Sequence, residues 1–468
     1  MSSQALLYII VIPMTWLAIR WFRTARTRQT ILLLTSYLLY ASWGLSFLGL
    51  LVISSIMNYF FGRLLRARQS ASRLWLGILS NLMLLGAFKY VPELQPLLSH
   101  TQLAPAIAHV VLPIGISFWT FQALSYLFDT FGGGELEPSL LEFLLYMTFW
   151  PTVLSGPICR LSSLLPQFRS TENSSLKDAA RGIDRICVGL FMVSLGEILA
   201  NGLHLNDGLD HAFQISPSNF SGADVWCLAF GYGFELFFNF AGYSHIVIGS
   251  ARIFGFELAE NFAAPYLSST PSEFWTRWHM SLSFWIRDYL FLPLAMVNRS
   301  KLWRNGALVI SMLIFGLWHR GTVLLALWGT YHGVLLVLHR QWQELKRHLR
   351  WNFRGHVASL ISWFATIVSI CLGWIFFRSD GLAQALSLLR SLAELSTYST
   401  VTLPHSLYRL IVVVAFGYLA TMGIGRLISG RFQNVRIPLE VRFVLYSIAI
   451  YLGILHSAQT QGFAYFQF

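Results

Sequence analysis

Apolar runs recur along the whole chain, and they constrain its fold more than any other feature. A helix needs about 20 apolar residues to cross the ~30 Å hydrocarbon core of a bilayer. Many runs reach this length, and hydrophobic residues make up 55% of the sequence against 12% charged residues, with a mean hydropathy of +0.57. The runs predict an all-α polytopic membrane protein with roughly 10–13 spanning and re-entrant elements. A soluble protein with one buried core would not supply so many.

The net charge of +12 comes from clusters of basic residues in short connections between apolar runs. Such clusters mark the cytoplasmic side, so the charge needs no nucleic-acid partner. They predict an outward-facing N-terminus and a membrane hairpin over 29–62. Residues 1–22 lack a basic stretch before their apolar run and are expected to be a retained first span. The clusters are Arg20, Arg23, Arg26 and Arg28; Arg63, Arg66, Arg68 and Arg73; and Lys346, Arg347, Arg350 and Arg354.

Two histidines, His319 and His332, interrupt an apolar stretch between the basic segments Arg299–Arg304 and Arg340–Arg354. The interval is too long for one ordinary span and only just long enough for two. We therefore expect His319 near a turn or break at membrane depth, where ionisable groups usually mark a functional site. The active centre is expected within 110–335, between N-terminal membrane helices (1–109) and supporting C-terminal membrane helices (336–468).

Prolines and glycines interrupt two further apolar segments. Pro113 and Gly115 predict a broken helix start, followed by polar groups along one side of the helix. The segment 149–160 carries two prolines and a glycine, and a re-entrant element that lines a site would satisfy its backbone. An ordinary kinked helix is the alternative. The polar segment that follows, 161–177, has spaced leucines and is expected to lie at the membrane interface.

The residues 273–290 are predicted to form one helix at the membrane interface, because three tryptophans lie beside charged residues. Arg277, Arg287 and Asp288 would face the headgroups or the cytosol, where an anionic cofactor could approach. A purely structural interface helix is the alternative. The shared apolar face consists of Trp275, Trp278, Leu282 and Trp285.

The four cysteines are scattered and form neither a disulfide framework nor a metal-like spacing. We therefore expect no bound metal. They are Cys159, Cys187, Cys227 and Cys371.

Six motifs, in order along 110–335, resemble the bacterial membrane-bound O-acyltransferase family, in particular its alginate O-acetylation branch. A single motif of this kind would be weak, but six in family order are specific. They are L-P-I-G-I-S-F-W-T-F-Q (112–122), S-G-P-I-C-R (155–160), N-F-A-G-Y-S (239–244), E-N-F-A-A-P-Y (260–266), R-W-H-M-S-L-S-F-W-I-R-D-Y (277–289), and G-L-W-H (316–319) with the later Y-H-G (331–333).

The resemblance implies a funnel-shaped helical fold with His319 as the family histidine and His279 as the second histidine. An imidazole titrates close to neutral pH, so it can deprotonate a hydroxyl or protonate a leaving thiolate. Each histidine could instead serve helix packing, which is the role expected for His332. The motifs contribute further candidates for binding the donor: Arg320, Arg277, Trp278, Ser281, Arg287, Asp288, Asn261, Tyr243 and Gln122.

The chain departs from the family pattern at three places. Arg320 replaces the glycine that usually follows G-L-W-H, and P-L-A-M-V-N-R (293–299) replaces P-L-G-G-N-R. Relatives commonly read D-F-S-G-Y-S-D where this chain has Asn239, Ala241 and His245, so two carboxylates are absent. The acceptor therefore need not be alginate.

The function that the resemblance implies is O-acetylation of an exported surface polysaccharide, alginate or cellulose-like, by a multi-pass protein of the bacterial inner membrane. The donor would be acetyl-CoA or another acyl thioester, with no bound cofactor. The expected partners are a periplasmic SGNH-type acetyltransferase and a polysaccharide synthesis and export complex. A transporter or flippase for a polymer or lipid-linked substrate is the alternative, because broken helices and intramembrane polar residues serve transport too. A scaffold without activity is a third possibility.

Overall fold

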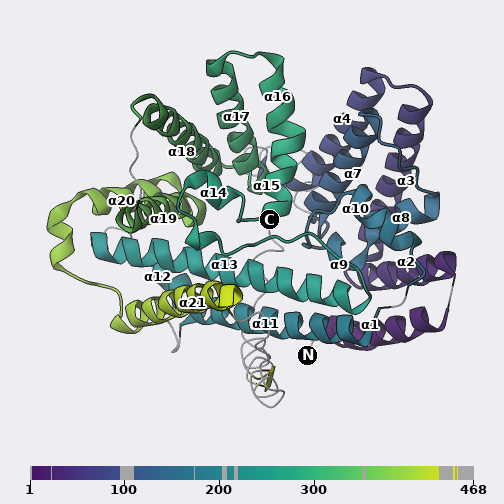
Figure 1. Cartoon of the computed structure of the whole chain (residues 1–468), viewed down its shortest axis with the longest axis horizontal. Coiled ribbons are helices and arrows are strands. Elements are labelled where there is room, and N and C mark those ends of the chain that lie inside the picture. Colours follow the sequence, from purple (N-terminus) through teal and green to yellow (C-terminus); the bar gives the residue numbers. More distant parts are fainter. Residues whose placement is uncertain are drawn as a thin grey trace. The chain divides into compact units, whose positions relative to one another are not determined.

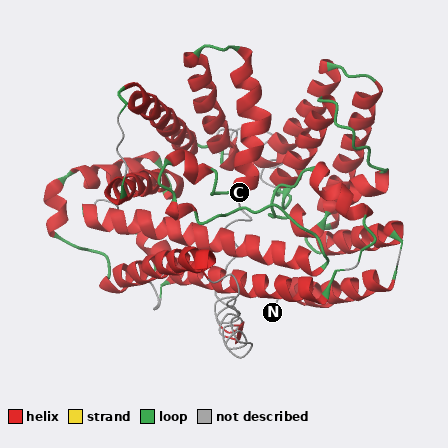
Figure 2. Cartoon of the chain, in the orientation of Figure 1, coloured by secondary structure: helices red, strands yellow, loops and turns green. Residues whose placement is uncertain are grey.

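The computed structural model describes residues 3–22, 24–94, 110–172, 174–202, 208–215, 220–350, 355–431, 446–447 and 451. Helices are the regular elements throughout these residues, and no strand occurs among them (Figure 2). The chain divides into two units. Unit 1 takes its described residues from Met1–Ile186 and Ser244–Glu260, and unit 2 from Cys187–Tyr243 and Asn261–Gln461.

Six helical segments among the described residues are long and apolar enough to cross a membrane. Together with the all-helical architecture, they confirm an all-α polytopic membrane protein. The apolar residues 443–457 lie largely outside the described residues. The six segments are Leu45–Ala67, Ala71–Lys89, Met280–Val297, Val323–His348, His356–Arg378 and His405–Gly423.

Unit 1 begins with two helical hairpins, α1 with α2 and α3 with α4. The membrane hairpin predicted over 29–62 would pair α2 with α3, and it stays a prediction because α2 is not among the candidate spans. A three-residue connection separates α2 from α3, and a short turn joins α3 to α4 (Figure 1). The elements are α1 (Ser3–Trp21), α2 (Ala25–Ala41), α3 (Leu45–Ala67), α4 (Ala71–Lys89), η1 (Pro92–Leu94), α7 (Ile116–Phe131), α8 (Leu140–Thr148), α9 (Trp150–Val153), α10 (Leu161–Arg169), and parts of α11 (Leu176–Asn201) and α13 (Gly222–Ile253).

The first basic cluster holds the connection that follows α10. The guanidinium of Arg20 donates to the carbonyl oxygen of Ser174 at 2.8 Å, and that of Arg28 donates to the carbonyl oxygen of Glu172 at 2.8 Å. Gln29 donates to the carbonyl oxygen of Phe168 at 3.1 Å. Two of the four arginines that the sequence assigns to the cytoplasmic side therefore also satisfy backbone carbonyls that no helix satisfies.

Both predicted breaks are present in unit 1. Helix α7 begins at Ile116, directly after Gly115, whose φ of +76° is a conformation that glycine adopts without strain. The chain leaves the helix at Phe149, makes the single turn α9, and is irregular from Leu154 to Arg160. The kinked-helix alternative for 149–160 is therefore wrong. Helix α10 covers only the first half of the predicted interfacial segment, and it buries its leucines and Phe168 on one face.

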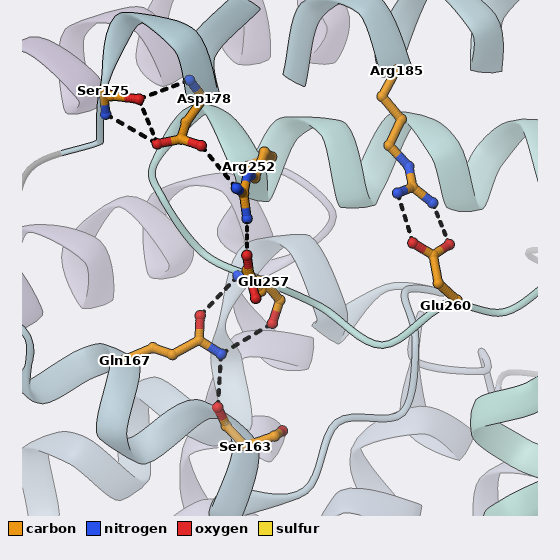
Figure 3. A network of polar contacts seen from close by, with 8 residues as sticks. All are labelled: Ser163, Gln167, Ser175, Asp178, Arg185, Arg252, Glu257 and Glu260. Carbon is orange, nitrogen blue, oxygen red and sulfur yellow. Dashed lines mark hydrogen bonds and ion pairs between the residues drawn. The ribbon is translucent and has the colours of Figure 1, made fainter. Parts of the chain in front are cut away.

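A polar network joins α10, α11, the end of α13 and the chain that follows it (Figure 3). Arg252 pairs with Asp178 at 2.8 Å and also with Glu257. Arg185 forms a bidentate pair with Glu260. The network holds the segment 254–260 against the first turns of α11 through charged groups, which a pattern of apolar residues does not reveal.

Unit 2 contains the remaining helices. Helices α16 and α17 run antiparallel and lie side by side (Figure 1). The elements, besides parts of α11 and α13, are α12 (Leu209–Gln214), η3 (Pro265–Leu267), α14 (Pro271–Trp275), α15 (Met280–Ile286), the π-helical turn η4 (Arg287–Phe291), α16 (Leu292–Val297), α17 (Lys301–His319), α18 (Val323–His348), α19 (His356–Arg378), α20 (Leu382–Ala393), η5 (Leu395–Ser399) and α21 (His405–Arg431).

Helices α17 and α18 form the tight hairpin that the sequence predicts between the two basic segments. A Cβ on Gly316 would lie 2.0 Å from the carbonyl oxygen of Leu325, and one on Gly329 would lie 2.1 Å from that of Met312. No real Cβ tolerates such contacts, so only glycine permits the two backbones to approach this closely. The connection is the three residues 320–322, which leaves His319 as the last residue of α17.

Asp224, at the start of α13 and outside the six candidate spans, holds the chain that enters α21. Its carboxylate is buried and accepts hydrogen bonds from six groups. Ser221 and Thr402 each donate their backbone N–H and their hydroxyl, Leu403 donates its backbone N–H, and Tyr408 donates its hydroxyl. Burial raises the pKa of this carboxyl, but the hydrogen bonds from Tyr408, Ser221 and Leu403 outweigh burial and lower the pKa to about 2.

We predict that Asp224→Asn destabilises the protein by about 2 kcal/mol at neutral pH, because an amide cannot replace both acceptor oxygens. Thermal unfolding in detergent should show a lower Tm. Since the folded-state pKa lies below the unfolded one, this stability is present above pH ~4 and is lost as the pH falls through ~2. The difference in Tm between wild type and variant should therefore become smaller in acid. An equal difference in Tm at pH 7 and pH 2 would contradict a stabilising role for the charge on Asp224.

Candidate functional site

His319 ends α17 inside an aromatic cage. Its side chain is buried, with the residue 5% exposed. Its ring centroid lies 5.0 Å from that of Phe315, 4.7 Å from Trp318, 5.6 Å from Trp328 on α18, and 5.2 Å from Phe377 on α19. The expectation that this histidine lies next to a turn is confirmed. The cage restricts where the imidazole can move and keeps bulk water from most of it.

His332 lies one helical turn beyond Trp328 on α18 and is completely buried. Its ring centroid lies 5.0 Å from that of Trp328, 5.2 Å from that of Trp275 and 5.3 Å from that of Tyr331. Neither ring nitrogen has a hydrogen-bond partner in the described part of the chain, and Nε2 lies 2.5 Å from where a Cβ on Gly373 would stand. Trp328 therefore separates the two histidines of the hairpin, and His332 packs against helix α19.

The predicted single helix over 273–290 is wrong. Helix α14 ends at Trp275, a turn follows, and α15 begins at Met280. His279 stands at the junction with φ +41° and ψ +53°, a left-handed conformation that breaks the helix. The predicted common face therefore does not exist. Its four members are buried in the protein interior: Trp275, Trp278, Leu282 and Trp285.

Asn261 braces the strained turn at His279. Its carbonyl oxygen accepts a hydrogen bond from the Met280 N–H at 2.9 Å, and its side-chain oxygen accepts one from the Ser281 hydroxyl at 2.6 Å. The N–H of Ala263 donates to the carbonyl oxygen of Arg277 at 3.0 Å. These contacts bind the segment 261–263 to both sides of the turn. Asn261 and Ser281, both buried and both predicted to bind the donor, contact each other here.

The imidazole of His279 is buried edge-on against Phe240, with ring centroids 4.6 Å apart. Neither of its nitrogens has a hydrogen-bond partner in the described residues. Consecutive ring contacts connect it to His319 across unit 2, so the two predicted catalytic histidines belong to one aromatic cluster. The connecting rings are Phe240, Phe262, Trp278, Trp374 and Trp328.

A pocket of about 250 Å³ reaches this cluster. Its walls include Trp275, which contacts His332, and Phe315, which contacts His319. Arg287 and Arg340 also line it. On α17 the lining runs from Leu308 to Phe315, a rise of about 10 Å at 1.5 Å per residue. The pocket therefore combines two cations with an aromatic wall that touches the histidine cages.

The remaining donor-binding candidates are distributed more widely. Arg287 pairs with the neighbouring Asp288 at 2.6 Å, and Arg277 pairs with Glu273 at 2.6 Å. Arg320 is exposed directly after α17. Of the predicted donor-binding residues, only Arg287 lines the pocket described above.

Two further candidates, Tyr243 and Gln122, lie on helices α13 and α7. Tyr243 is half-buried on α13, at the end of the part that belongs to unit 2. Gln122 belongs to unit 1, where both atoms of its buried side-chain amide lack a hydrogen-bond partner in the described residues. Gln122 also offers its carbonyl oxygen to the Tyr146 hydroxyl at 3.2 Å. The structure therefore gives Gln122 a place in the core of unit 1.

Metal-ligating groups do not gather in the part of the chain that the structure describes. No group of three or more His, Cys, Asp or Glu side chains there could hold a metal ion. The four cysteines are buried free thiols.

Comparison with known proteins decides the family. The model of MBOAT, the membrane-bound O-acyltransferase family, matches residues 135–379, slightly more than half of the chain. The chain belongs to the membrane-bound O-acyltransferase family. It is therefore a multi-pass membrane O-acyltransferase, and the resemblance carried by the six motifs is confirmed.

Three relatives illustrate the range of this family. The chain is 34% identical over 399 residues to the probable alginate O-acetylase AlgI of Azotobacter vinelandii, covering 82% of this chain and 76% of that protein. It is 32% identical over 411 residues to the peptidoglycan O-acetyltransferase of Helicobacter pylori, covering 79% and 74%. The teichoic acid D-alanyltransferase of Streptococcus thermophilus is 34% identical over 244 residues, covering 50% and 58%.

The sequence analysis did not predict the pocket, nor the roles of Phe315, Trp328 and Arg340 in building the site. Phe315 and His319 are four residues apart on α17, and Trp328 and His332 are four apart on α18, so helical spacing places each pair on one face. Which faces meet depends on the packing of the two helices. Arg340 carries no sequence signal of its own, because it is one of several basic residues that mark the end of a span.

We predict that Asn261→Ala lowers the acyl-transfer kcat by about tenfold to a hundredfold, because the turn that carries His279 loses the side-chain hydrogen bond between Ser281 and Asn261 and keeps only the backbone ones. Asn261→Asp keeps an acceptor for the Ser281 hydroxyl and should recover part of the rate. The control is Asn201→Ala at the exposed end of α11. Steady-state kinetics and size-exclusion chromatography separate a positioning effect from misfolding. Unchanged kcat in a folded Asn261→Ala variant would contradict the bracing role.

Proposed function

We propose that this enzyme transfers an acetyl group from a thioester donor to a hydroxyl acceptor, with His319 as the general base. The observation that carries the proposal is the position of His319 at the end of α17, in contact with Phe315, whose ring also lines the pocket with two arginines. An ionisable group buried at a helix end in a membrane protein is a functional candidate by default. Here it adjoins a pocket that can hold a substrate.

The reaction needs one group that accepts a proton and returns it. The hydroxyl oxygen attacks the thioester carbonyl, so a C–O bond forms and the C–S bond breaks. The hydroxyl proton passes to the imidazole of His319, which returns it to the departing thiolate. The aromatic cage of His319 supports this role, because it holds the ring in place and limits competing hydrolysis.

The pocket between α14, α15, α17 and α18 is proposed to take the donor. Arg287 and Arg340 suit the phosphate groups of acetyl-CoA or of another phosphate-bearing acyl thioester. Phe315, Trp275 and Met312 give the inner wall an apolar surface suited to the uncharged arm and the acyl group. With the donor phosphates bound near Arg287 and Arg340, the thioester end of the donor would point toward the aromatic cage of His319.

His279 is assigned the positioning of the donor or the relay of a proton. The left-handed turn that carries it is strained, and strained backbone of this kind clusters at functional sites. The bracing by Asn261 supports a residue whose placement matters. His332 is assigned a packing role, because its ring is enclosed by three aromatic side chains and the backbone at Gly373.

We infer that the acceptor is a polysaccharide of the cell surface. Alginate, peptidoglycan and teichoic acid, the polymers in the names of the relatives, all carry hydroxyl groups. An alginate-like or cellulose-like polymer fits this range. The proposal places the protein in the bacterial inner membrane, where it passes the acetyl group outward to a periplasmic SGNH-type acetyltransferase and a polysaccharide export complex. Membership of an O-acyltransferase family favours this function over a transporter or flippase that performs no chemistry.

We predict that His319→Ala abolishes acetyl transfer, with a loss of at least about a hundredfold, because general acid–base catalysis contributes that much or more. Isotope-labelled acetyl-CoA, supplied to membrane vesicles with acceptor polymer and partner protein, measures the transfer. The control is His348→Ala at the exposed end of α18. Full transfer by His319→Ala would end the assignment, and transport of polymer without acetyl transfer by wild type would favour the flippase.

We predict that Arg340→Gln raises the KM for the thioester by about tenfold and leaves kcat nearly unchanged, because a charge-assisted contact to the donor is lost from both the ground state and the transition state. Arg347→Gln, about two helical turns further along α18 and not among the residues that line the pocket, is the matched control. Initial rates over a range of donor concentrations separate the two constants. A fall in kcat with unchanged KM would contradict a role for Arg340 in binding the donor.

A further inference from the structure

A second pocket, which we call the α17 groove, lies beside the first turns of α17 and has a volume of about 450 Å³. Its polar lining comes from Asn298, Ser300 and Asn305. Trp303 and Gly306 also line it. The groove shares no lining residue with the pocket that reaches the histidine cages. It is therefore a separate feature that the acyl-transfer proposal does not use.

The rest of the α17 groove is apolar. Leu302, Val309 and Ile310 contribute from α17, and Val337 contributes from α18. Asn298 and Ser300 stand just before α17, and Val309 and Ile310 lie about two to three turns further along the helix, with Leu302 and Asn305 between them. The groove thus changes from polar to apolar in the direction of the helix axis, which is the pattern of an amphiphilic ligand with a polar head and an aliphatic chain.

Basic residues are the chain neighbours of the residues that form the polar end of the groove. Arg299, Lys301 and Arg304 alternate along the chain with the residues that line it. Lys301 pairs with Glu344, and Arg340 donates to the side-chain oxygen of Asn305 at 3.4 Å. Arg299 and Arg304 are exposed, and neither forms an ion pair with a carboxylate in the described ranges.

The surroundings of the groove are those of a membrane interface. Met296 is 73% exposed, Val297 is 72% exposed and Leu302 is 84% exposed, although all three are apolar. The indole N–H of Trp303 donates to the carbonyl oxygen of Leu294 at 2.7 Å, which fixes a tryptophan at this level. Exposed apolar side chains, a tryptophan and arginines together are typical of the zone where headgroups meet acyl chains, and the arginines indicate the cytoplasmic leaflet.

We propose that the α17 groove binds one anionic phospholipid of the cytoplasmic leaflet. The phosphate lies at the polar end, where Arg299 and Arg304 supply the complementary charge and Asn298 and Ser300 supply hydrogen bonds. One acyl chain follows the apolar wall toward Ile310. The ligand is a lipid rather than a free phosphate, because a soluble anion would make no favourable contact with the apolar half of the groove.

Two variants of the full-length protein test the proposal. Gly306→Leu fills the groove, and nothing lies within 4 Å of the new Cβ, so the helix has room for the side chain. Its matched control is Gly86→Leu on α4, where the space around the Cβ is equally open. Arg299→Gln combined with Arg304→Gln removes the charge, and Arg63→Gln combined with Arg68→Gln, exposed on the α3–α4 hairpin, is the control.

Native mass spectrometry of purified protein, titrated with phosphatidylglycerol or with phosphatidylcholine of the same chains, counts the bound lipids. Wild type and both controls should retain phosphatidylglycerol more tightly than phosphatidylcholine. The groove-filling variant and the double arginine variant should each weaken phosphatidylglycerol retention by about tenfold. Size-exclusion chromatography of every variant confirms that the comparison is made between folded proteins.

Three results would overturn the proposal. Equal retention of phosphatidylglycerol by wild type and by the double arginine variant would remove the charge recognition. Equal retention of both lipids by wild type would remove the preference for an anion. Displacement of the lipid by glycerol 3-phosphate at similar concentration would assign the site to a soluble phosphate ester.

Discussion

The close approach of α17 and α18 is the constraint on which the proposed site depends. Gly316 and Gly329 allow carbonyl groups of one helix to lie where a side chain of the other would stand. At this separation the turn between the helices needs only three residues, so His319 ends its helix beside Trp328. The same approach sets the pocket wall at Phe315. A larger residue at either glycine would separate the helices and open the cage.

The second histidine depends on a different device. A left-handed residue other than glycine costs about 1–3 kcal/mol, so the turn at His279 persists only because its surroundings hold it. Asn261 accepts hydrogen bonds from Met280 and Ser281 on one side of the turn, and Ala263 donates to Arg277 on the other. Burial of the imidazole against Phe240 adds apolar contact. Strain in one place and rigid aromatic packing around it are consistent with a group that must be placed accurately for acyl transfer.

The features predicted well from the sequence are those set by local chemistry. The helix break at Gly115, the irregular segment before Arg160 and the position of His319 all follow from glycine, proline, basic flanks or run length. The prediction of one helix over 273–290 was wrong because apolar spacing continues through His279, while hydrogen bonds that Asn261 accepts from the next two residues hold His279 in a left-handed conformation. Periodicity reports which residues are apolar, and it does not detect a brace that comes from a distant segment.

By itself, the sequence determined that this protein is a helical membrane protein with an unusual pair of histidines in one apolar hairpin. Run length, charge placement and proline or glycine breaks act within a few residues, so they can be recognised without a fold. Only the tertiary structure decided that Trp328 separates His319 from His332, that Asn261 braces His279, and that Arg340 shares a pocket with Phe315. Each of these depends on side chains that meet across helices, and such meetings are set by packing rather than by spacing along the chain.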